Sequence, residues 1–168
     1  MNVERSAAAP SEGRVPYLVW RETGGEALLV DWDGPIPDLV AIVERERLRP
    51  VWHACTAARD PGAQVTAQLA ALFPALRTAW YAGCGTLRFG GLRVDVVWTP
   101  YGAEEGRAAD DGDDGSAGLS FVVDERVAFV GVLPAAAAAR DERAARSLEV
   151  VREYASAATL YPAADDGA

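Results

Sequence analysis

The stretch R-P-V-W-H-A-C-T-A-A-R-D-P-G at residues 49–62 is the part of the chain around which the fold is organised. Residues 51–55 predict a short strand, because apolar residues dominate there and Pro50 precedes them. Asp60 followed by Pro61 predicts a helix start, since an Asp cap and a proline at the first helical position suit a helix N-terminus. This strand, turn and helix have the surroundings of a metal-binding turn. They offer only one His, one Cys and one Asp, whereas such a turn clusters several ligands.

Alternating strands and helices are predicted on both sides of this stretch. Apolar patterning predicts strands at residues 15–20, 27–30, 80–82, 86–89, 92–98, 119–123, 127–132 and 159–161. Helices are predicted at residues 38–48, 60–73, 135–139 and 140–158. In the first of these, Asp38 is the expected N-cap and Pro50 the expected stop. Paired glycines at residues 24–25 and 90–91, and the pair Asp124-Glu125, predict hairpins. The pattern indicates a mixed α/β fold with helices covering sheet faces.

Length and composition predict one compact domain over residues 15–164. The chain has 168 residues, half of them hydrophobic, which is enough for a core. No apolar run approaches the ~20 residues that a membrane span needs. The first 14 residues lack the apolar core of a secretion signal, so we expect a disordered tail there and a cytoplasmic location. All 16 basic residues are Arg, which excludes a Schiff-base or phosphate-loop lysine and indicates a GC-rich bacterial source.

Charge disfavours nucleic acid as a partner. The formal net charge is −9, and a phosphate backbone would be repelled. Six of the acids lie between Glu104 and Asp114, which predicts an acidic mobile loop at residues 101–118. The run D-D-G-D-D-G at residues 110–115 resembles a calcium loop but departs from its pattern, because Gly112 occupies a ligand position and Phe121 the closing one, which disfavours a calcium site.

The side chains available for acid–base or thiol chemistry are few. The protein has a single His, so a poly-histidine metal site is excluded. Cys55 and Cys84 cannot form a disulfide framework and are expected to be buried and reduced. His53 shares a strand face with Cys55. Two alternatives follow: His53 is a buried, hydrogen-bonded neutral imidazole, or it is a base that activates the Cys55 thiol.

The chain carries short sequence motifs in the same order as the metallo-β-lactamase-fold hydrolases of the glyoxalase II type, and it resembles that family. The phrases are Pro16-Tyr17-Leu18-Val19, the strand ending Leu28-Leu29-Val30-Asp31, Leu48-Arg49-Pro50, residues 87–100 (L-R-F-G-G-L-R-V-D-V-V-W-T-P), and Thr159-Leu160-Tyr161-Pro162. The resemblance implies a four-layer αβ/βα sandwich with two similar halves. It also implies a metal turn of the form Thr-His-x-His-x-Asp-His, with Thr56 at its first position.

The ligand positions that the resemblance implies hold no metal-binding side chains. They fall on Ala57, Arg59, Pro61, Gly62, Gly102, Val132 and Ala164. None of these side chains coordinates zinc or iron, and an arginine repels a cation. A shifted register that uses His53 and Cys55 restores two ligands, which do not make a tight site. The family's reaction needs a metal-activated water.

The sequence therefore predicts a metal-free, non-catalytic relative without a cofactor, which binds a protein partner or a second copy of itself. The alternative is a metal-independent enzyme or small-molecule binder that uses the vacated cleft, for example in a bacterial biosynthetic pathway. Its candidate cleft residues are Asp31, His53, Cys55, Arg59 and Asp60. In that alternative Arg59 and the following helix start would bind a small anion, whereas the plain expectation is that Asp60 is a helix cap and Asp31 orders a loop.

Overall fold

The computed structural model describes residues 1–6, 15–32, 35–56, 63–79, 85–99, 118–130 and 142–162. They divide into two compact units. Unit 1 comprises the described parts of Met1–Cys55, Arg59–Trp80 and Leu87–Arg93, and unit 2 comprises those of Thr56–Ala58, Tyr81–Thr86 and Val94–Ala168. No helix formed by the described residues is long and apolar enough to cross a bilayer.

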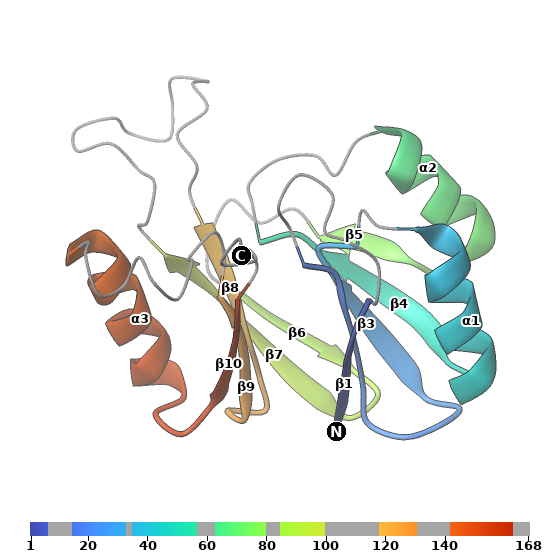
Figure 1. The fold of residues 1–168 in the computed structure, drawn as a ribbon. Helices are drawn as coiled ribbons and strands as arrows, with labels where there is room; N and C mark the ends of the chain where they lie inside the picture. The colour runs from blue at the N-terminus through green and yellow to red at the C-terminus, as the bar shows by residue number, and fades with distance from the viewer. Residues whose placement is uncertain are drawn as a thin grey trace. The chain divides into compact units, whose positions relative to one another are not determined.

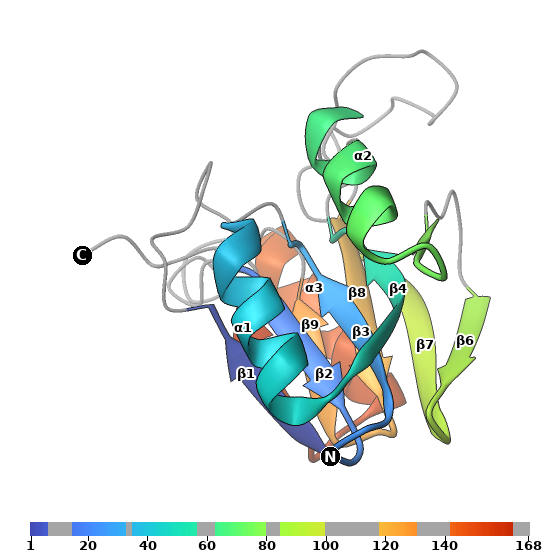
Figure 2. The ribbon, with the colours of Figure 1, turned by 90° about the vertical axis from the view of Figure 1, so that its right-hand side faces the viewer.

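Unit 1 contains a five-stranded mixed sheet with two helices on one face (Figures 1 and 2). The strands are β1 (Asn2–Arg5), β2 (Tyr17–Trp20), β3 (Glu26–Val30), β4 (Arg49–Ala54) and β5 (Arg77–Ala79), in that spatial order. The first three pair antiparallel, while β3, β4 and β5 pair parallel. Helices α1 (Ile36–Glu46) and α2 (Ala63–Leu72) supply the crossovers between the parallel strands.

The core of unit 1 lies between this sheet and its helices. Side chains of the sheet, of α1 and of α2 pack in one cluster that includes Leu18, Leu29, Trp32, Leu39, Ile42 and Leu69. Residues of β2 and β3 are almost entirely inaccessible to solvent, as continuous apolar runs in a two-sided sheet should be. Burial of this apolar surface is the main term that stabilises the unit.

Three details of unit 1 correct the sequence predictions. Residues 2–5 form strand β1, which pairs with β2, and Glu4 forms an ion pair with Arg45 of α1; the predicted tail is therefore wrong for these residues. Helix α1 begins after Pro35 without a side-chain cap, so Asp38 lies in the first turn and is not the N-cap. The helix ends at Glu46 and is capped by Arg47, whose left-handed backbone closes the last turn, and Pro50 lies inside β4.

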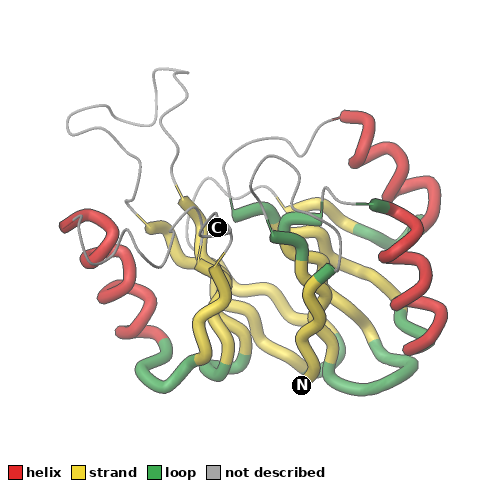
Figure 3. The backbone as a smooth tube through the Cα atoms, in the orientation of Figure 1, coloured by secondary structure: helices red, strands yellow, loops and turns green. Residues whose placement is uncertain are grey.

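Unit 2 contains most of a second five-stranded sheet, with α3 (Glu142–Tyr154) beside it (Figure 3). The spatial order is β10 (Thr159–Pro162), β9 (Val127–Val130), β8 (Gly118–Val123), β7 (Leu92–Thr99) and β6 (Gly85–Phe89). Strands β7, β8 and β9 pair antiparallel, and β10 pairs parallel with β9. Val97, Val122, Val130 and Val151 belong to the cluster between sheet and helix.

Two predicted hairpin turns of this region, one at Gly90-Gly91 and one at Asp124-Glu125, are confirmed. Gly90 and Gly91, between β6 and β7, have φ of 50° and 73°, as a type I′ turn requires. Asp124 and Glu125, between β8 and β9, have φ of 48° and 58° without being glycine. The predictions for residues 80–82, 101–117, 131–132 and 135–141 lie outside the described residues.

Candidate functional site

The carboxyl ends of β3 and β4 bring two predicted cleft residues to the same edge of the sheet. The strands pair parallel with Val30 opposite Ala54, so Asp31 and Cys55 follow directly at neighbouring ends. The Asp31 amide donates a hydrogen bond to the Ala54 carbonyl over 2.9 Å. Asp31 has a left-handed backbone with φ of 50° and is 2% exposed. Ligands of α/β proteins bind at the carboxyl ends of parallel strands, so Asp31 and Cys55 are candidates for a ligand-binding site.

His53 lies on the helix-covered face of the sheet. In register it pairs with Leu29 of β3 and Thr78 of β5, and Leu29 belongs to the core cluster under α1 and α2. The His53 side chain has no accessible surface. Burial disfavours the charged imidazolium and lowers the pKa of His53 to about 4. The imidazole is therefore neutral at physiological pH.

The contacts of the imidazole join it to Cys55. Nε2 of His53 lies 3.8 Å from Sγ of Cys55. Nδ1 is buried and makes no hydrogen bond to a described residue. The structure buries the imidazole, as the first sequence alternative expects, but it gives Nδ1 no hydrogen-bond partner among the described residues. A nucleophile and its base must both reach a substrate. With Cys55 2% exposed and His53 fully buried, this pair does not present such a face to solvent.

A catalytic metal ion does not fit the described residues. A site needs three or more converging His, Cys, Asp or Glu side chains, and no such group occurs in the described parts of the chain. His53 and Cys55 provide at most two donors, and both are enclosed in the core. Ala57, Arg59, Asp60, Pro61, Gly62, Gly102, Val132 and Ala164 lie outside the described residues. The anion site at Arg59 therefore stays a prediction from sequence.

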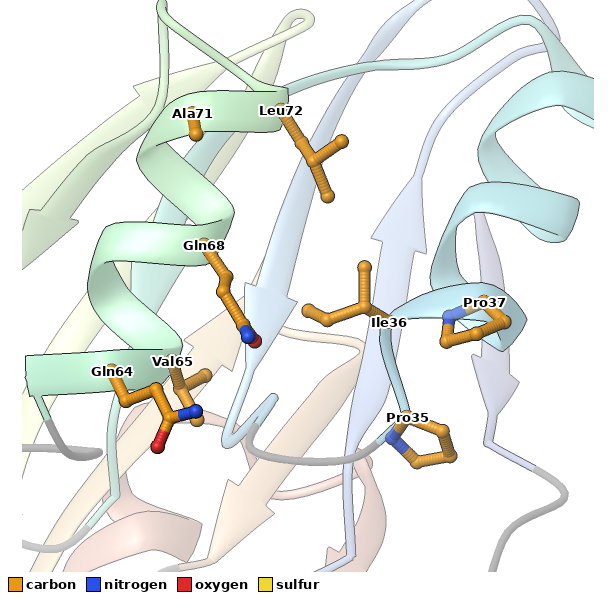
Figure 4. Close-up of a pocket in the computed structure, with 8 residues that line it drawn as sticks. All are labelled: Pro35, Ile36, Pro37, Gln64, Val65, Gln68, Ala71 and Leu72. Atoms are coloured by element: carbon orange, nitrogen blue, oxygen red, sulfur yellow. The ribbon is translucent and has the colours of Figure 1, made fainter.

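An open groove beside α2 is a feature that the sequence predictions missed. It has a volume of about 740 Å³ and lies between the start of α1 and the length of α2. Figure 4 shows Gln68 and Leu72 extending from α2 toward the start of α1, where Ile36 lies. The sequence carried one signal for it, because no charged residue occurs between Asp60 and Arg77.

Comparison with known proteins identifies the fold. No family model and no curated protein sequence matches the chain. Among solved structures, a metallo-β-lactamase from Staphylococcus aureus matches 99% of this chain with a TM-score of 0.65 and 14% identity. ETHE1 from Myxococcus xanthus matches 98% of it with a TM-score of 0.65 and 17% identity, and the B3 metallo-β-lactamase BLEG-1 matches 76% with a TM-score of 0.57 and 14% identity.

The chain has the metallo-β-lactamase fold, as its order of phrases predicted. It spans 56% of the length of the Staphylococcus protein, 76% of ETHE1 and 70% of BLEG-1. The TM-scores of 0.57 to 0.65 establish the shared fold, whereas identities of only 14% to 17% leave activity to be argued from the residues of this chain.

Proposed function

We propose that this chain is a metal-free member of the metallo-β-lactamase fold that acts as a binding module and not as a hydrolase. The observation that carries the proposal is that donor side chains are absent from the expected ligand positions. The seven positions at which the fold's ligands are expected hold no His, Asp or Cys. The His and Cys nearest to them in sequence are packed inside unit 1.

The burial of His53 supports this proposal. A ligand imidazole must present a nitrogen lone pair to an ion at the mouth of a site. Here the ring is buried on the strand face that it shares with Leu29 of the core cluster, and burial lowers its pKa to about 4. A residue of this kind contributes to packing, and a role in activating water would need contact with solvent.

A substrate panel tests the non-catalytic part of the proposal. Purified protein is incubated with zinc, manganese or iron(II) and assayed on thioester, lactam and phosphoester substrates. We expect rates equal to those of buffer containing the same metal, because the seven expected ligand positions hold no donor side chain and the described residues form no donor cluster that could hold a metal-bound water. Turnover that depends on both metal and protein, and that survives a second purification step, would contradict the proposal.

A further inference from the structure

We draw no further inference here: the strongest candidate, the uncharged face of α2 among the described residues together with the open groove between this helix and the start of α1, carries none, because nothing in the structure shows what covers it.

Discussion

His53 of β4 and Cys55, the residue that follows this strand, face each other with Nε2 and Sγ 3.8 Å apart inside unit 1. A regular strand places residues i and i+2 on one face, which is what brings the two side chains together. Both are buried, and the contact lies where the crossover from β4 toward α2 begins. The pair is therefore part of the packing of unit 1, with properties that can be measured.

The titration of His53 is the first such property. It is the only histidine in the chain, so a single imidazole signal reports on it in a proton NMR titration. We expect the pKa of His53 to be about 4 because burial disfavours its charged form. A midpoint near the ordinary value of ~6.5 would show that the ring is in contact with water.

The same burial makes stability depend on pH. Because the pKa of His53 is about 4 in the folded chain and 6.5 in the unfolded one, the unfolded state binds more protons between these values. The free energy of unfolding therefore falls as pH is lowered from about 6.5 to about 4, by about 3 kcal/mol from this group. Urea unfolding measures it at several pH values.

The variant His53→Gln isolates this contribution, since carboxylates contribute to acid unfolding in both proteins. The free energy of unfolding of the wild type minus that of the variant should decrease by about 3 kcal/mol when the pH is lowered from about 7 to about 4. Parallel pH profiles for the two proteins would show that His53 does not carry the effect.

Cys55 should be protected from alkylation in the folded protein. Its side chain is 2% exposed, and a thiol must reach the reagent to react. Labelling with iodoacetamide, followed by mass spectrometry of the peptide that contains Cys55, should be slow without denaturant and fast in urea. Rapid labelling under native conditions would contradict the burial and reopen the thiol–imidazole alternative.

A stabilising substitution is expected at Glu125. Its φ of 58° is in the left-handed region, which costs a residue with a side chain about 1 kcal/mol more than glycine. Glu125→Gly creates the sequence Asp-Gly, the preferred pair for this turn, and should raise the free energy of unfolding by about 1 kcal/mol. Urea unfolding measures the change.

The opposite substitution in the other hairpin is the control. Gly91 has φ of 73°, and an added Cβ would lie 3.0 Å from Nη1 of Arg21. Gly91→Ala should lower the free energy of unfolding by about 1 kcal/mol or more. If both substitutions changed the free energy of unfolding in the same direction, backbone strain in these turns would not be the controlling term.

Most elements could be predicted because they depend on local patterns. The apolar strands, the glycine pair and the turn at Asp124-Glu125 carry period-two or turn signals that adjacent residues supply. Strand β1 could not be predicted, because its sequence N-V-E-R has no apolar alternation and the strand forms by pairing with β2. The start of α1 was misplaced because Asp38 matches a cap, whereas Pro35 and the packing of Ile36 place the start three residues earlier.

The candidate site was harder to predict for a different reason. Sequence spacing predicted that His53 and Cys55 share one face of the strand, and their contact agrees with this. It could not predict that the helices cover this face. Burial depends on residues far away in the chain, such as Leu29 and Leu69. The groove beside α2 likewise joins residues about 30 positions apart, so no local pattern could reveal it.

Metal retention is the most direct test of the central claim. The purified chain is incubated in turn with zinc, manganese and iron(II), passed through a desalting column and analysed by mass spectrometry for bound metal, with an established zinc enzyme treated in parallel. We expect well below one equivalent of each metal per chain, because the seven expected ligand positions hold no donor and the described part of the chain has no cluster of three donors. Retention of about one equivalent or more would contradict the account. Loss of that metal in His53→Gln would place a ligand at His53, and its persistence would require a ligand set elsewhere in the chain.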